Sequence, residues 1–91
     1  MSATTIRRDR HDIAAEILEI AGVGLISTHI MYKAKLSFSQ LREYVPLLLE
    51  KGLLEKLTVV RHRQSKHILK TTEKGQKFLQ SLKSLELLWL P

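Results

Sequence analysis

The sequence contains no cysteine, and this absence excludes disulfide bonds, thiolate metal sites and cysteine nucleophiles. No apolar run approaches the roughly 18 residues that a membrane-spanning helix needs, and the first twelve residues lack the apolar centre of a signal peptide. Internal repeats, low-complexity tracts and linkers are absent as well. The 91 residues therefore predict a single soluble, intracellular domain.

Catalytic patterns are also missing. No nucleophile is placed beside a base, no glycine-rich loop could hold a phosphate, and no pair of carboxylates suggests acid–base chemistry. The only candidate metal ligands besides carboxylates are His11, His29, His62 and His67. Two of them could face each other, but zinc needs three or four ligands in a tetrahedral array. We expect no enzymatic activity, no metal and no cofactor.

Acidic residues are fewer than basic ones: 9 Asp and Glu stand against 15 Lys and Arg, a formal net charge of +6 at pH 7. This balance favours an anionic partner, either nucleic acid or a membrane surface. Toward its C-terminal end the chain has little basic bias, with Lys74, Lys77 and Lys83 against Glu73 and Glu86, so a membrane surface is disfavoured. An apolar fraction of 44% is ordinary for a folded domain.

The most informative segment is Lys56–Lys70, which contains no acid. Two apolar runs, Leu57–Val60 and Ile68–Leu69, flank a polar tip at Arg61–His67. This pattern predicts a β-hairpin with strands at about 54–61 and 67–71. A cationic hairpin tip suits the phosphate backbone of a nucleic acid, and the alternative is an ordinary solvated hairpin. The basic residues of the segment are Lys56, Arg61, Arg63, Lys66 and Lys70.

Three helices are predicted before the hairpin. In the first, which Asp9 could cap, apolar residues recur at helical spacing until Gly22 and Gly24 end it. These apolar residues are Ile13, Ile17, Ile20 and Ala21. A very short strand at residues 25–26 follows, and Ser27 is expected to cap a second helix over about residues 28–34.

The third helix, about 38–51, has a clear beginning and end. Ser37 and Gln40 fit a capping box at its start, and Gly52 is a candidate for a left-handed residue at its end. Pro46 lies inside it and cannot donate to the Arg42 carbonyl, but the surrounding pattern is strong enough that we expect the helix to continue with a kink there. Its expected buried stripe consists of Leu41, Tyr44, Val45 and Leu48.

A last helix is predicted from about Thr72 to Leu90. The order helix, short strand, helix, helix, hairpin, helix is that of a winged helix-turn-helix, an α+β fold that is mostly α. We divide the chain into a basic N-terminal arm (residues 1–8), a DNA-binding domain (9–71) and a C-terminal dimerisation helix (72–91). The basic residues assigned to the arm are Arg7, Arg8 and the adjoining Arg10, and the arm either follows a groove of DNA or is a solubilising tail.

The outward side of the third helix is the expected DNA reader, because the first residues of a recognition helix reach the base edges. Gln pairs well with adenine and Arg with guanine, whereas Glu43 would either point away from the phosphates or accept a hydrogen bond from cytosine. No acid occurs between Glu19 and Glu43, so the second helix and the turn after it can contact phosphates. The predicted DNA-binding residues are Thr28, His29, Lys33, Lys35, Ser39, Gln40, Arg42, Arg61, Arg63 and Lys66.

The last helix has an apolar seam, with Phe78, Leu82, Leu85 and Trp89 at spacings of four, three and four. A small winged helix cannot bury this seam and the neighbouring leucines in its own core. The exposed remainder predicts a homodimer interface. The alternative is a monomer in which this helix covers the core.

The segment Thr28–Ser37 resembles the second helix and turn of small archaeal winged-helix DNA-binding proteins, in which an Ile-Met-Tyr triplet leads through Ala to Leu-Ser. Later residues resemble the same family in order and spacing, and the resemblance covers about residues 8–85. These are Leu41, Tyr44, Leu48, Leu49, Gly52, Leu53, Leu54 and Thr72–Gly75. Three features depart from the family pattern: the short last helix, Pro46, and Lys35 where Asn is expected.

The resemblance implies a protein that binds double-stranded DNA as a dimer joined by antiparallel last helices. It implies either a transcription regulator or an abundant chromatin-like protein, located in the cytoplasm with the nucleoid. The competing hypothesis is a winged-helix protein-interaction module that docks through its Leu- and Trp-rich C-terminal helix. The charge pattern favours DNA, because an adaptor has no need for five basic residues without an acid around its hairpin.

Overall fold

The structure is a computed structural model that describes residues 10–89, apart from the side chains at positions 86, 87 and 89. Asp9, the predicted cap of the first helix, and the N-terminal arm lie outside the described residues. The elements are α1 (Arg10–Ile20), a 3-10 turn η1 (Ala21–Val23), α2 (Ser27–Ala34), α3 (Phe38–Glu50), β1 (Leu54–Arg61), β2 (Gln64–Thr71) and α4 (Glu73–Trp89). This order confirms the predicted winged helix-turn-helix class.

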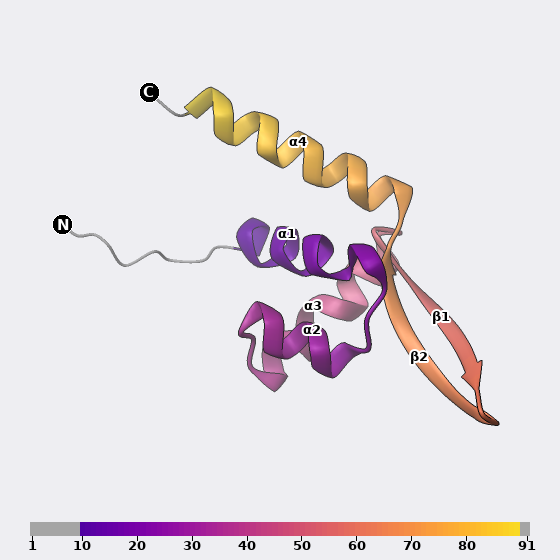
Figure 1. Cartoon of the computed structure of the whole chain (residues 1–91). Helices are drawn as coiled ribbons and strands as arrows, with labels where there is room; N and C mark the ends of the chain where they lie inside the picture. The colour runs from indigo at the N-terminus through magenta and orange to yellow at the C-terminus, as the bar shows by residue number, and fades with distance from the viewer. Residues whose placement is uncertain (1–9, 90–91) are drawn as a thin grey trace.

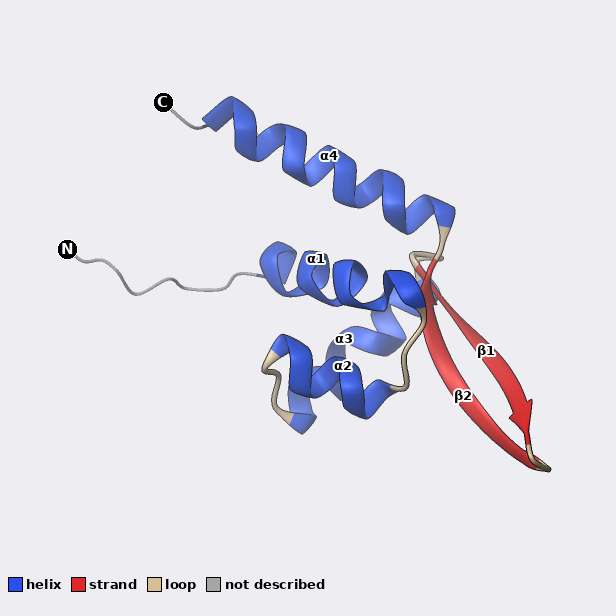
Figure 2. Ribbon diagram, in the orientation of Figure 1, coloured by secondary structure: helices blue, strands red, loops and turns tan. Residues whose placement is uncertain are grey.

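Helices α1, α2 and α3 form a cluster from which the β-hairpin projects, as Figure 1 shows. α4 returns along α1, on the side of α1 that faces away from α2 (Figure 1). The hairpin, red in Figure 2, is the only sheet among residues 10–89. No helix in the described part of the chain is both long and apolar enough to cross a membrane.

The core lies where α1, α2, α3 and the base of the hairpin meet. Ile17, Leu18, Ile30 and Leu54 are its largest fully buried side chains. The predicted stripes of the first and third helices are buried in it, although Ile20 and Val45 are only partly so. α4 contributes Leu79, which is 5% exposed, so the first half of this helix belongs to the same core.

The short strand predicted at residues 25–26 is a single β-bridge. The amide of Leu25 donates to the carbonyl of Leu69 over 3.0 Å, and the amide of Leu69 donates back over 2.8 Å. This reciprocal pair attaches the segment between α1 and α2 to β2, which thus has a partner on each side at Leu69. The base of the hairpin is thereby held against the helices.

Both ends of α3 agree with the prediction. The Ser37 hydroxyl accepts from the Gln40 amide over 3.1 Å, and the Gln40 side chain accepts from the Ser37 amide over 2.9 Å. At the other end Gly52 has φ of +74°, and the amides of Gly52 and Leu53 donate to the carbonyls of Leu49 and Leu48. These two bonds form a Schellman motif. α3 continues through Pro46, as expected.

The predicted cap of α2 is wrong by one residue. Ile26 occupies the cap position without a side-chain hydrogen bond, and Ser27 is already helical. The Ile26 carbonyl accepts the first hydrogen bonds of the helix, from the amides of His29 and Ile30. α2 ends at Lys35, whose φ of +55° is left-handed. Asn tolerates this conformation better than most residues, which explains why it is expected at this position.

The hairpin is longer than predicted, and the polar tip at Arg61–His67 is wrong. β1 and β2 pair from Leu54 and Thr71 out to Arg61 and Gln64, which leaves only two residues in the turn. Both turn residues, His62 and Arg63, have positive φ, of 51° and 64°. Two left-handed residues define a type I′ turn, whose twist matches that of the paired strands. Residues 64–67 therefore belong to β2, and their polar side chains are exposed to water.

The segment between β2 and α4 is tied to the end of α3. The Thr72 hydroxyl donates to the Gly52 carbonyl over 2.6 Å and accepts from the Gly75 amide over 3.0 Å, so it caps α4. The Lys74 ammonium donates to the Lys51 carbonyl over 2.9 Å. Gly75 is buried against the backbone of Leu53. The Thr72–Gly75 segment thus fixes the start of α4 against the C-terminal end of α3.

Candidate nucleic-acid interface

The outward face of α3 contains Ser39, Arg42, Glu43 and Pro46, all exposed. Of the residues predicted to read bases, Ser39 and Arg42 are therefore available on the surface. Gln40 is only partly exposed, and its side-chain oxygen is occupied by the capping box. Its amide nitrogen is the part of the side chain that remains to contact a base.

Glu43 is paired within the protein. Its Oε1 lies 2.9 Å from Nη2 of Arg10, the first residue of α1. The hydrogen bond with Glu43 raises the pKa of Arg10 above its ordinary value, so the guanidinium stays charged. The pair supports the first of the two alternatives for Glu43, in which the carboxylate does not face the phosphates.

Arg42 is placed by a neighbouring aromatic ring. Its guanidinium carbon lies 5.7 Å from the centroid of Phe38, one turn earlier on α3. Phe38 itself is 62% exposed. A guanidinium over an aromatic face is attracted by the ring quadrupole, which narrows the range of side-chain conformations that Arg42 samples.

The predicted phosphate contacts of α2 and its turn are all at the surface. Thr28 and His29 lie in the first turn of α2, and Lys33 and Lys35 lie at its end. The two groups are thus at opposite ends of a short helix. α2 and the following turn contain no acid, so these ends present neutral or positive groups to a ligand.

The hairpin presents two different faces, because side chains alternate along a strand. Lys56, His67 and Leu69 share the face toward α3, where they line a hollow with Ser27, Val45 and Leu49. Leu57 and Ile68 share the opposite face, where Ile68 lies beside Gly24. The predicted contacts Arg61 and Lys66 belong to this second face, and Arg63 lies in the turn itself. All three are exposed.

The register therefore reveals two residues that the sequence reasoning left out of the DNA-binding set. Lys56 and His67 lie on the face of the hairpin, or wing, that is directed toward α3. The Thr58 hydroxyl lies 3.2 Å from Nδ1 of His67. The alternation of side chains along the two strands could have identified these residues in the sequence. Assigning each residue to a face, however, requires the correct turn length.

α4 changes character along its length. Phe78 and Leu82 are partly buried, Leu85 is 54% exposed and Leu88 is 81% exposed. The side chain of Trp89, the fourth predicted interface residue, lies outside the described residues. The first half of α4 packs on α1, and its last turns expose Leu85 and Leu88.

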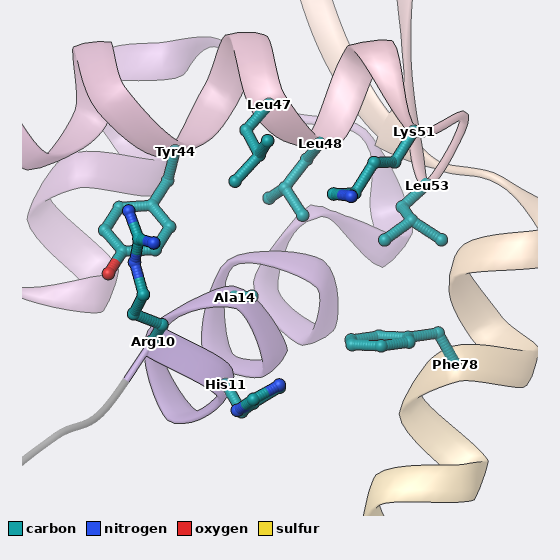
Figure 3. A pocket seen from close by; sticks show the side chains of 9 residues that line it. All are labelled: Arg10, His11, Ala14, Tyr44, Leu47, Leu48, Lys51, Leu53 and Phe78. Atoms are coloured by element: carbon teal, nitrogen blue, oxygen red, sulfur yellow. The ribbon is translucent and has the colours of Figure 1, made fainter.

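A second hollow, of about 400 Å³, lies between α1, α3 and α4. Figure 3 shows the Arg10 side chain beside the ring of Tyr44, with the ring of Phe78 directed into the hollow from α4. The walls also include Leu47, Leu48 and Leu53. This hollow lies on the opposite side of α3 from the Phe38–Arg42 pair, so it is separate from the DNA-facing surface described above. Within residues 10–89, no three His, Asp or Glu side chains gather as a metal site would require.

Several solved structures share this fold. The protein smu.1704 from Streptococcus mutans UA159 aligns with a TM-score of 0.79 at 19% identity, over 94% of this chain and 86% of that one. The PcaV transcriptional regulator from Streptomyces coelicolor, solved with its natural ligand, aligns at 0.63 and 21% identity, over 81% of this chain and 52% of that one.

A mutant of ZitR from Lactococcus lactis aligns with a TM-score of 0.61 at 16% identity, over 99% of this chain and 68% of that one. No curated protein matches the sequence. The family model described as winged helix-turn-helix matches residues 7–89, which is nearly the whole chain. The chain therefore belongs to the winged helix-turn-helix family, a class of DNA-binding domains and not of enzymes.

Proposed function

We propose that the protein binds double-stranded DNA as a homodimer and acts as a transcription regulator or a chromatin-like architectural protein. α3 enters the major groove, and the wing at residues 61–67 contacts the backbone or the minor groove. The observation that carries this proposal is the distribution of charge around α3. α2, its turn and the wing from Lys56 onward contain no acid, and Glu43 on α3 is paired with Arg10.

The dimer is supported by the exposed apolar end of α4. Leu85 and Leu88 present apolar surface that the described part of the protein does not cover, and Leu82 continues the seam toward the core. Pairing of this end with a second copy buries these side chains and completes an antiparallel helix pair. The division into an arm (1–8), a DNA-binding domain (9–71) and a dimerisation helix (72–91) is part of this proposal.

A two-fold dimer presents two copies of α3 and two wings to one duplex. Binding of the first copy raises the effective concentration of the second, so affinity exceeds that of a single domain. The proposed location is the cytoplasm, with the nucleoid, since the ligand is DNA. Likeness to the archaeal chromatin-like proteins stays a prediction that rests on the residues of α2 and its turn.

The experiment is fluorescence anisotropy of a labelled random duplex titrated with protein at several salt concentrations. We expect affinity to fall steeply with salt, with a slope of about 0.9 per phosphate neutralised. Substituting Arg61→Ala together with Arg63→Ala should weaken binding to all duplexes alike and reduce that slope by about two for each protomer, or about four for the dimer. Both side chains are exposed, so the fold should not change.

The matched control removes two positive charges elsewhere, with Lys77→Ala and Lys83→Ala on α4. These lysines are also exposed and lie 3.9 Å and 4.0 Å from Glu73 and Glu19. The control should leave the salt slope unchanged. A wing variant with unaltered affinity would remove the wing from the mechanism, and equal losses in both variants would reduce its role to net charge.

The alternative function is a protein-interaction module that docks through α4. The exposed Leu85 and Leu88 favour it as much as they favour a homodimer. Sedimentation of the purified protein separates the two: a monomer that fails to bind DNA at low salt would favour the adaptor.

A further inference from the structure

A shallow hollow of about 480 Å³ lies beside the start of α3, on the side of the helix that faces α2 and the wing. Its lining is mostly apolar and contains no acid. It consists of Ser27, Phe38, Leu41, Arg42, Val45 and Pro46. Phe38 and Pro46 are exposed, so the hollow is open to a ligand that approaches α3 from outside.

Phe38 is the least expected residue in this hollow. It is the first residue of α3 and is 62% exposed, whereas the core beneath it is formed by Leu41 and by residues of other elements. The ring carries the guanidinium of Arg42 at 5.7 Å. An arginine held in this way loses less conformational freedom when it binds, so the ring prepares it for a directed contact.

The neighbouring side chains leave few other candidates for reading bases. The oxygen of Gln40 is held by the capping box, and Glu43 is held by Arg10. The first turns of α3 therefore offer Ser39, Arg42, Phe38 and the amide nitrogen of Gln40. In the major groove an arginine pairs with O6 and N7 of guanine, and an apolar side chain contacts the C5-methyl group of thymine.

We infer that Phe38 determines sequence specificity. Its ring and the apolar wall of the hollow receive the C5-methyl group of a pyrimidine, while Arg42, stacked on the ring, pairs with the neighbouring guanine. Each half-site then prefers a thymine–guanine step, or a 5-methylcytosine–guanine step, which presents the same methyl group. This inference rests on the proposed function, namely DNA binding through α3.

The test begins with selection of bound duplexes from a random library. The selected sequence should contain a thymine–guanine step. Two modified bases, each lacking one recognised group, then test the two proposed contacts to this step. Uracil in place of that thymine removes only the methyl group, and burial of one such group is worth about 0.8 kcal/mol, or about fourfold in affinity. 7-Deazaguanine in place of the guanine removes the N7 acceptor, with an expected loss of about tenfold.

The two variants should respond in opposite ways. Phe38→Ala should bind the thymine and uracil duplexes equally and still distinguish guanine from 7-deazaguanine. Arg42→Ala should lose the distinction at guanine. Tyr32→Ala is the matched control, because Tyr32 is an equally large aromatic residue on α2 that is 74% exposed. It should keep both distinctions.

The outcomes separate this inference from the proposed function. A protein that binds DNA with a steep salt dependence but selects no sequence, or binds thymine and uracil duplexes equally, would overturn only the role of Phe38. The same holds if Phe38→Ala keeps the preference for thymine. No binding of any duplex at low salt would overturn the proposed function itself. Circular dichroism of each variant confirms that the exposed substitutions leave the fold intact.

Discussion

Replacing Gly75 by alanine should destabilise the fold through one methyl group. Gly75 is buried in the first turn of α4, where the helix passes the turn between α3 and β1. An added methyl carbon would lie 2.6 Å from Cγ2 of Thr71 and 3.2 Å from the carbonyl carbon of Leu53, and it would overlap the Leu53 carbonyl oxygen. The obstacle is mainly backbone, so it cannot turn aside as a flexible side chain does.

Two opposing terms set the magnitude. Alanine in place of glycine normally stabilises a helix position by about 0.5–1 kcal/mol. Overpacking of a filled site costs about 1–3 kcal/mol, and the Leu53 carbonyl also accepts a hydrogen bond from the Thr72 amide over 3.0 Å. The methyl group therefore disturbs that bond as well, which costs about 0.5–1.5 kcal/mol more. Together the three contributions give an expected net loss of about 1–3 kcal/mol in the free energy of unfolding.

The assay is urea denaturation followed by circular dichroism, at one fixed protein concentration because dimerisation would shift the midpoint. In a thermal scan at the same protein concentration, the melting temperature should fall by about 4–8 °C for each kcal/mol. Gly22→Ala is the control, since its methyl would meet only the end of the Gln76 side chain, at 3.5 Å. It should be neutral or stabilising by about 0.4–1 kcal/mol. If Gly75→Ala is as stable as the Gly22 variant, α4 is not held against Leu53 as described.

Two further predictions concern α2 and α4. Lys35→Gly should raise the free energy of unfolding by about 0.5–1 kcal/mol, because Lys35 has φ of +55° and glycine adopts that conformation without strain. The same variant should reduce the salt slope of DNA binding by about one for each protomer, or about two for the dimer, and an unchanged slope would exclude Lys35 as a phosphate contact. Leu82→Ala with Leu85→Ala should yield monomers in analytical ultracentrifugation, whereas a pair that still sediments as a dimer would place the interface elsewhere.

The fold class was predictable because its signals are local. The capping box of Ser37 and Gln40, the glycine that ends α3 and the apolar spacing of α1 all act within a few residues. Each depends on short-range geometry that the sequence determines by itself. The hairpin was visible for the same reason, as two apolar runs in a basic segment.

Contacts between distant residues needed the tertiary structure. Ser27 does not cap α2, since Ile26 occupies the cap position without a side-chain hydrogen bond. Leu25, just before the helix, pairs with the distant Leu69 of β2, and Glu43 faces Arg10, which is 33 residues away in sequence. No local pattern identifies either partner, since each pairing depends on how distant segments pack together.

The wing depends both on local signals and on contacts between distant residues. Its residues predict a cationic hairpin, but a type I′ turn at His62 and Arg63 lacks the usual Asn-Gly signal, so the tip was placed too broadly. Turn length sets the register, and the register decides which side chains face α3. Charge and fold class therefore follow from the sequence. Only the tertiary structure decided that Lys56 and His67 face α3 and that Arg42 lies over the ring of Phe38.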